Sequence, residues 1–254
     1  MTAIANTNQL LVHNEERPDA EIRLFCFPYA GSTAQLFLRW NDYVPEWIAV
    51  SGFEMPAHGR RLCQSKAIDD QTEAATYIAD ALMALVDRPY ALFGHCLGAA
   101  LAYEATRILQ SRGAPQPLHL FSSGARAPHL GLPIANVNEM NDEDFIEHFG
   151  NVYGAPLGLL NDPHMRPYVL PMVRADASMT QNYHYDPGPP VTYGITAVAG
   201  EDDPDVELEH LNEWRRHTTA SVSTRLYPGN HFFFVEAAAQ LLSDFTNEIE
   251  SQLT

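Results

Sequence analysis

Short apolar segments recur along the chain and alternate with longer segments of helical periodicity. Several of the short segments are apolar throughout, as strands are when both faces of a sheet are covered. A regular alternation of strands and helices is typical of a parallel sheet with helices on both faces. The pattern therefore predicts an α/β fold with a mostly parallel, doubly wound sheet. The predicted strands are 22–27, 48–53, 90–94, 118–123, 193–200 and 222–227.

Three amphipathic segments predict the helices that cover this sheet. The first, 69–87, carries its apolar side chains on one stripe and begins with Asp70 at an N-capping position. The second, 97–115, ends at Gly113 and a following proline, which is typical helix-stop chemistry. The third, 236–253, is amphipathic to the end of the sequence.

Residues 129–190 interrupt the alternation. Two helical segments, 141–150 and 162–183, follow each other with no strand between them, and proline-bearing segments flank them. Two ordinary packing helices would have the same pattern, but successive helices at the carboxyl edge of the strands favour a lid. We therefore expect a core built from 1–128 and 191–254, with a helical lid insertion at 129–190.

Composition restricts the class of protein and of partner. The chain has 254 residues, of which 46% are hydrophobic, and this is enough to bury a large core. The net charge of −17 argues against nucleic acid and anionic membranes as partners. Three cysteines do not predict a disulfide framework, and neither a signal peptide nor a membrane-spanning run is visible. These features predict a cytoplasmic protein, which we expect to be a monomer.

The stretch Gly94-His95-Cys96-Leu97-Gly98 has the shape of a nucleophile elbow, with cysteine where serine is usual. It follows a predicted strand and opens a predicted helix, as the elbow of α/β-hydrolases does. The turn is tight, so small residues are needed on either side of the nucleophile. A helix N-terminus beneath a thiol favours its anionic form. Cys96 is therefore the candidate nucleophile.

A nucleophile of this kind needs a base and an acid that orients the base, in the chain order nucleophile, acid, histidine. Asp203 lies on the turn after the strand 193–200 and is the preferred acid, with Asp202 and Asp205 as rivals. His231 lies between the last strand and the last helix and is the candidate base. His95 and His58 are better interpreted as structural, since neighbours on a tight turn point apart and His58 lies in an early loop.

The oxyanion of a tetrahedral intermediate needs two preorganised N–H donors. The backbone of Leu97, directly after the nucleophile, is the first candidate. The second is expected from the loop after the strand 22–27, where Ala30 is preferred and Tyr29 is the alternative. Gly31 would let this loop close.

Six stretches in register resemble the type II, stand-alone editing thioesterases of nonribosomal peptide and polyketide assembly lines. They are LFCFPYAGSTAQLFLRW, ALFGHCLGAALAYEATRIL, LFSSGARAP, LPMVRADASMTQNY, GEDDPDV and YPGNHFFF. The resemblance implies an α/β-hydrolase fold with a helical lid and hydrolysis of acyl groups stalled on the phosphopantetheine arm of an acyl or peptidyl carrier protein. The sequence shows no metal cluster and no nucleotide-binding loop, so we expect no metal and no cofactor beyond that arm.

Carried over by position, the resemblance assigns the nucleophile to Cys96, the acid to Asp203 and the base to His231. Met172, Ala175 and Met179 fall in the stretch that lines the family's acyl chamber, although buried lid packing explains them equally well.

The cysteine departs from the family's serine, and this leaves several interpretations open. Cys96 is a native catalytic thiol, a deliberate exchange of the serine, or the remnant of a site that only binds. A native thiol makes acyl transfer or cyclisation onto an amine or carbon nucleophile more plausible, because the acyl-cysteine stays activated. A small-molecule lactone hydrolase with a cysteine elbow, like dienelactone hydrolases, is the other enzymatic alternative.

Overall fold

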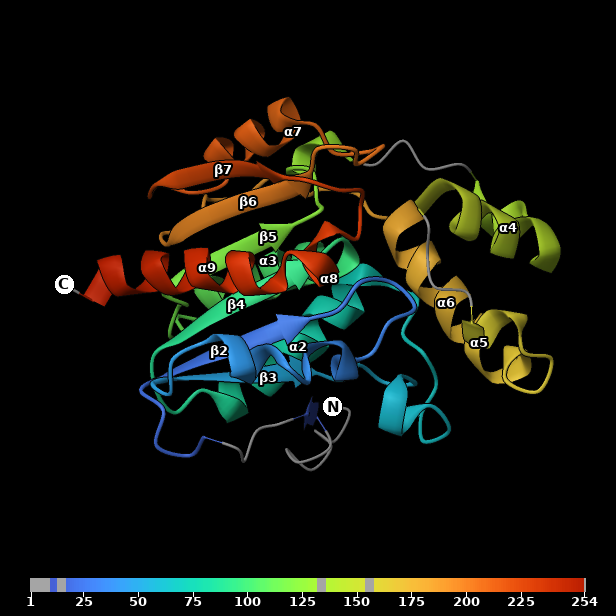
Figure 1. Cartoon of the computed structure of the whole chain (residues 1–254), viewed down its shortest axis with the longest axis horizontal. Coiled ribbons are helices and arrows are strands. Elements are labelled where there is room, and N and C mark those ends of the chain that lie inside the picture. The colour runs from blue at the N-terminus through green and yellow to red at the C-terminus, as the bar shows by residue number, and fades with distance from the viewer. Residues whose placement is uncertain (1–9, 13–16, 132–135, 154–157, 254) are drawn as a thin grey trace.

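Within the described residues, seven strands form one sheet with the order β1-β3-β2-β4-β5-β6-β7 (Figure 1). The computed structural model describes residues 10–12, 17–131, 136–153 and 158–253. All neighbouring strands are parallel except β1, which pairs antiparallel with β3. The predicted α/β fold with a mostly parallel sheet is thus confirmed. The strands are β1 (Leu11–Val12), β2 (Ile22–Phe27), β3 (Ile48–Phe53), β4 (Tyr90–His95), β5 (His119–Ser123), β6 (Gly194–Gly200) and β7 (Val222–Tyr227).

The strand positions follow the apolar runs of the sequence to within one residue at each end. Only β1 escaped prediction, because two residues are too few to show a period. Strands β2 to β6 are almost entirely buried, as strands covered on both faces must be.

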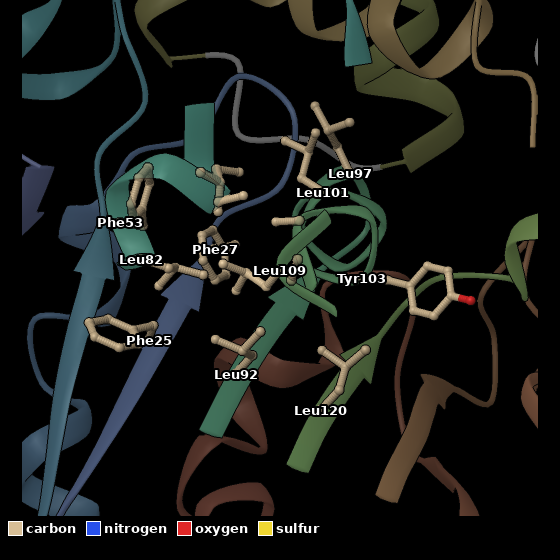
Figure 2. Close-up of a cluster of buried hydrophobic side chains, with 14 of the residues drawn as sticks. Phe25, Phe27, Phe53, Leu82, Leu92, Leu97, Leu101, Tyr103, Leu109 and Leu120 are labelled. Carbon is tan, nitrogen blue, oxygen red and sulfur yellow. The ribbon is translucent and has the colours of Figure 1, made fainter. Parts of the chain in front are cut away.

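Successive residues of each strand point to opposite faces, and each face is covered by its own helices. On one face, Phe25 of β2 and Leu92 of β4 pack with α2 (Gln71–Leu85) and α3 (Leu97–Ser111) (Figure 2). On the other face, Leu24 and Phe93 pack with α8 (Phe233–Glu236) and α9 (Ala238–Leu253). The carboxylate of Asp70 caps α2 by accepting the Glu73 N–H at 2.8 Å, as its position predicted.

Short helical segments complete the core. They are η1 (Ala34–Phe37), η2 (Trp40–Tyr43), η3 (Gly59–Arg61), η4 (Pro128–Leu130), η5 (Val137–Glu139), α7 (Leu208–Asn212) and η6 (Glu213–Arg216).

Between β5 and β6 the described residues form three α-helices, α4 (Asp142–Tyr153), α5 (Gly158–Asn161) and α6 (Arg166–Gln181). They lie together beyond one end of the sheet, at the right in Figure 1. Their apolar side chains form a hydrophobic cluster of their own, in which Phe145 and Val169 are buried and to which no described strand contributes. The sequence predicted two helices here, and the short α5 is an addition. We call the helices α4 to α6 the lid.

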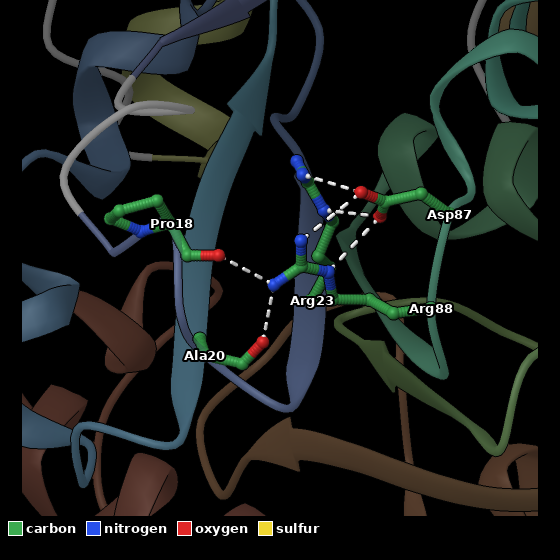
Figure 3. Close-up of polar contacts among 5 residues, drawn as sticks. All are labelled: Pro18, Ala20, Arg23, Asp87 and Arg88. Atoms are coloured by element: carbon green, nitrogen blue, oxygen red, sulfur yellow. Dashed lines mark hydrogen bonds and ion pairs between the residues drawn. The ribbon is translucent and has the colours of Figure 1, made fainter.

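The amino end of the sheet is held by a charged network (Figure 3). The Asp87 carboxylate accepts hydrogen bonds from Arg88 and from Arg23 of β2, and these guanidinium groups lower its pKa. Arg88 also donates to the carbonyls of Pro18 and Ala20. The network ties the loop after α2 to the start of β2, at the end of the sheet opposite the elbow.

No described helix is both long enough and apolar enough to cross a membrane. In the same part of the chain, no group of three or more His, Cys, Asp or Glu side chains is placed as metal ligands would be.

Candidate active site

Cys96 lies at the tip of a strained turn between β4 and α3. Its φ of 53° and ψ of −119° are values that a residue with a side chain rarely adopts, which is the conformation that an elbow requires. A side chain at Gly94 would overlap the backbone of Gly98 and Ala99, and one at Gly98 would overlap the backbone of β2. The small residues are therefore needed as predicted. The Cys96 N–H donates to the Ser123 carbonyl at 2.8 Å, which fixes the turn against β5.

His231 and Asp203 meet at the same end of the sheet. The Nδ1 of His231 lies 2.8 Å from Oδ2 of Asp203, and both side chains are buried. The loop of Asp203 begins at Gly200, where a Cβ would overlap the Asn230 carbonyl. This close approach brings the loops after β6 and β7 together. The predicted residue order therefore produces a histidine–carboxylate pair beside the elbow.

The imidazole of His231 and the side chain of Cys96 line the same pocket, and Cys96 is one of the groups that raise the pKa of His231. Burial alone would lower the pKa of His231. The interactions with Asp203 and Cys96 outweigh burial and raise that pKa to about 10. The arrangement thus stabilises an imidazolium between a carboxylate and a sulfur.

The two rival acids have other positions. Asp202 is exposed. Asp205 donates its backbone N–H to Oδ1 of Asp203 at 3.0 Å and so holds that carboxylate in place. Asp203 is the one of the three that the structure brings to His231.

His95 lies beneath the pair and not in it. It is fully buried, its Nδ1 is 2.9 Å from Oγ of Ser123, and its ring centroid is 4.9 Å from that of His231. Burial, followed by the charge of His231, lowers its pKa well below the ordinary value, so the ring is neutral. Its place agrees with a structural role in supporting the elbow.

The expected oxyanion donors lie on either side of the nucleophile. Leu97 is the first residue of α3. Among the described residues, no hydrogen-bond acceptor faces the backbone N–H of Leu97, Ala30 or Tyr29. Tyr29 and Ala30 line the same pocket as Cys96. Gly31 has a φ of +78°, so the loop turns at the expected glycine. Both candidates for the second donor remain available.

Two pockets meet at Cys96, and both are also lined by Gly124 and Thr180. The first has an empty volume of about 700 Å³ that opens to solvent. Its wall is mainly apolar and includes lid residues. The side chains that give it this character are Tyr29, Val137, Phe149, Ala177, Val206 and Phe232.

The second pocket carries more polar groups, among them Gln71, Arg126 and Gln181. Gln71 and Tyr183 also line a third groove, which leads outward along α2 and α3. Gln71 is only 6% exposed, and its amide nitrogen has no hydrogen-bond partner among the residues that the structure describes. A buried amide without a partner is costly to a fold, and it is a group to which a ligand can bind.

Three of the predicted chamber residues are not among the residues that line these two pockets. Met172 packs inside the lid cluster, Met179 packs into the core with α2 and α3, and Ala175 is half-buried. The face of α6 that lines the pockets carries Ala177 and Thr180 instead. Helical spacing explains the correction, because residues seven apart such as 172 and 179 share a face that points away from these positions.

Sequence reasoning also missed Gly124, whose Cβ would overlap His95 and crowd His231. A glycine directly after a parallel strand, at the end of the sheet that carries the elbow, is the signal that could have revealed it.

Comparison with known proteins places this geometry among related sites. Residues 22–249 match the model of the thioesterase domain. The chain is 32% identical over 238 residues to linear gramicidin dehydrogenase LgrE of Brevibacillus parabrevis, covering 92% of this chain and 90% of the relative. The name of that relative describes a dehydrogenase. The Gly-x-Gly-x-x-Gly fingerprint typical of dinucleotide-binding proteins does not occur in the present sequence.

Two solved structures are similar over almost the whole chain. The RedJ thioesterase from the prodiginine pathway of Streptomyces coelicolor is 36% identical, with a TM-score of 0.82 over 91% of this chain and 86% of that one. The type II thioesterase BorB from the borrelidin biosynthetic cluster is 27% identical, with a TM-score of 0.85 over 94% and 97%.

Proposed function

Because the chain belongs to the thioesterase-domain family, an enzyme family that hydrolyses thioesters, we propose that it is a type II thioesterase of a nonribosomal peptide or polyketide assembly line. Its substrates are acyl groups held as phosphopantetheine thioesters on an acyl or peptidyl carrier protein. The similarity to RedJ, a thioesterase of a prodiginine biosynthetic pathway, and to BorB, a type II thioesterase of a borrelidin biosynthetic cluster, supports this proposal.

One observation carries the proposal. Cys96 lies where two pockets meet, and His231, which pairs with Asp203, lines one of these pockets beside it. A thioester has two arms, the acyl chain and the pantetheine, and its carbonyl must lie at the nucleophile. An apolar pocket suits an acyl chain, and the pocket with Gln71 and Arg126 suits the amides of pantetheine.

The proposed reaction has two steps. The Cys96 sulfur attacks the thioester carbonyl, and the oxyanion that forms accepts from Leu97 N–H and from Ala30 or Tyr29 N–H. The bond from the carbonyl carbon to the pantetheine sulfur breaks, and the His231 imidazolium gives that sulfur its proton. Water then attacks the carbonyl carbon of the acyl-cysteine, and His231 accepts a proton from this water. The bond to Cys96 breaks, and the free acid leaves.

The sulfur supports transfer as a second outcome. Attack of a thiolate on a thioester exchanges one thioester for another, so the step is nearly isoenergetic and the acyl-cysteine stays activated. An amine or a carbon nucleophile in the second pocket would then compete with water. The products formed with and without an added amine distinguish hydrolysis from transfer.

Intact mass after incubation with acyl-pantetheine thioesters tests the nucleophile. We expect an acyl adduct on Cys96 and free acid on longer incubation. Cys96→Ala should lose both, whereas Cys63→Ala, which removes an exposed thiol, should keep them. Cys96→Ser restores the usual residue of the family and should still hydrolyse. Full turnover by Cys96→Ala would rule out the proposed nucleophile, and faster cleavage of a diffusible lactone than of an acyl-carrier protein would favour the lactone hydrolase.

The unpartnered Gln71 amide tests the pantetheine arm. Gln71→Leu should raise KM for acyl-pantetheine about three- to ten-fold, because a hydrogen bond to the arm is lost. A short thioester that lacks the arm should be hydrolysed as by the unchanged enzyme. Equal effects on both thioesters would place the arm elsewhere. A carrier-protein partner, a monomeric state and a cytoplasmic location remain predictions.

A further inference from the structure

A second buried histidine–carboxylate pair lies outside the proposed triad. Asp176 of the lid helix α6 is 3% exposed, and His58, after β3, is 5% exposed. Oδ2 of Asp176 lies 2.9 Å from Nε2 of His58. The same oxygen accepts the backbone N–H of Gly31 at 2.7 Å. One carboxylate thus bridges the lid, the loop after β2 and the loop after β3.

Through Gly31, the Asp176 bridge reaches the loop that carries the candidates for the second oxyanion donor. Gly31 directly follows Tyr29 and Ala30, the two candidates for the second oxyanion donor. A Cβ at Gly31 would approach the Val173 side chain of α6 to 3.0 Å, so the lid helix packs directly on this loop. The loop is therefore in direct contact with α6 at Gly31.

The hydrogen-bond partners of His58 explain why the pair is fixed. Its Nδ1 lies 2.8 Å from the Pro56 carbonyl, which can only accept. With Nε2 facing a carboxylate, both ring nitrogens donate, and the ring is an imidazolium. Burial lowers its pKa, but Asp176 and, more weakly, Glu54 raise it to about 9. A cation held on both sides cannot exchange protons with substrate, so its role is to hold Asp176.

Apart from this bridge, the lid contacts the rest of the protein through apolar side chains such as Met179, which packs with α2 and α3. The lid has its own hydrophobic cluster, and in the described residues no strand belongs to it. A buried charged pair with defined geometry specifies one seating of α6 more sharply than apolar contact does.

We propose that Asp176 is a positioning residue that ties the lid helix α6 to the oxyanion loop, so that the second donor is set only when this helix is seated. The inference rests on the proposed function, because it takes the N–H of Ala30 or Tyr29 as an oxyanion donor. It adds a coupling between lid and catalysis that the triad alone does not contain.

Hydrogen exchange tests the tie without any need for activity. In Asp176→Ala, the Gly31 N–H, resolved within residues 29–33, should exchange at least ten-fold faster, because it loses its acceptor. The matched control is Arg174→Gln, on the same helix as Asp176. It breaks a 2.7 Å ion pair between Arg174 and Asp142 of α4. It should change exchange in 29–33 by less than two-fold. Equal exchange in Asp176→Ala and the unchanged protein would overturn the proposal.

Kinetics test the consequence. With an activated aryl ester, the acylation rate of Asp176→Ala should fall about ten-fold while KM changes less than three-fold, because an oxyanion donor acts in the transition state. Alkylation of Cys96 by iodoacetamide displaces iodide and forms no oxyanion, so its rate should change less than two-fold. A loss confined to KM, or an equal loss in alkylation, would overturn the proposal.

Two further variants keep the test decisive. If Asp176→Ala does not fold, Asp176→Leu, which also removes the acceptor, serves for exchange, and Asp176→Glu should recover part of the acylation rate. Because the aryl ester needs no carrier, failure of the full enzyme on carrier thioesters alone would count against the proposed function and not against this tie.

Discussion

The two buried histidine–carboxylate pairs have almost the same length but different surroundings. His231 and Asp203 are 2.8 Å apart, and His58 and Asp176 are 2.9 Å apart. In both pairs the carboxylate helps to raise the pKa of the histidine, to about 10 and about 9. The second ring nitrogen makes the difference. His231 lies beside the Cys96 sulfur in the same pocket, whereas Nδ1 of His58 faces the Pro56 carbonyl. A histidine–carboxylate pair is thus suited to catalysis by what faces its other nitrogen.

The largest expected effect separates the two histidines. His231→Ala should lower kcat/KM on acyl-pantetheine by at least 10³-fold, because the proposed triad acts as a unit. His58→Gln should lower it by about ten-fold, through the position of Asp176 alone. Steady-state kinetics on both variants measure this. Equal losses would show that the two pairs do not differ as described.

The next effect separates the carboxylates of the turn after β6. Asp203→Asn should cost between 10²- and 10³-fold in kcat, because a neutral amide does not stabilise the imidazolium of His231. Asp202→Asn, on the exposed neighbour, should cost less than two-fold. The comparison needs only kcat at saturating thioester. If Asp202→Asn is the damaging change, the acid has been misassigned.

The third effect is a pH dependence of stability. The pKa of His58 is raised from 6.5 to about 9 in the fold, so its protonation favours the folded state. This contribution is full below pH 6.5, declines as pH rises towards 9, and is absent above that. It amounts to roughly 3 kcal/mol. The groups that face the ring are Asp176 from α6 and Glu54 after β3, and Arg61 donates to the Glu54 carbonyl.

Denaturant unfolding of the unchanged protein and of His58→Gln from pH 6 to 10 measures this dependence. The difference between their free energies of unfolding should shrink as pH rises. His231 is present in both proteins, so its own titration cancels. A difference that does not vary with pH would show that His58 is not the titrating group.

The smallest effect concerns the reactivity of the thiol. Iodoacetamide should alkylate Cys96 in His58→Gln within two-fold of the unchanged rate from pH 6 to 9, because His58 makes no contact with Cys96. In His231→Ala the pH dependence should change, since the imidazolium partner of the sulfur is lost. A shifted profile in His58→Gln would mean that the two pairs are coupled more directly than through the oxyanion loop.

Local sequence pattern determined much of the molecule. Uniformly apolar runs marked the buried strands, because a strand covered on both faces leaves no polar position. The elbow was visible at Cys96 because its turn demands small residues at fixed offsets, and Gly94 and Gly98 supply them. Asp203 and His231 could be chosen because parallel strands carry the loops that follow them to one end of the sheet.

Only the tertiary structure decided what depends on how distant segments meet. His58 and Asp176 are 118 residues apart and have no shared periodicity or motif, so nothing local pairs them. The rotation of α6 about its own axis determines which side chains line the pocket at Cys96. These are Ala177 and Thr180, whereas Met172 and Met179 pack into the lid cluster and the core. The sequence determined the nucleophile and its loops, and the seating of the lid determined what surrounds them.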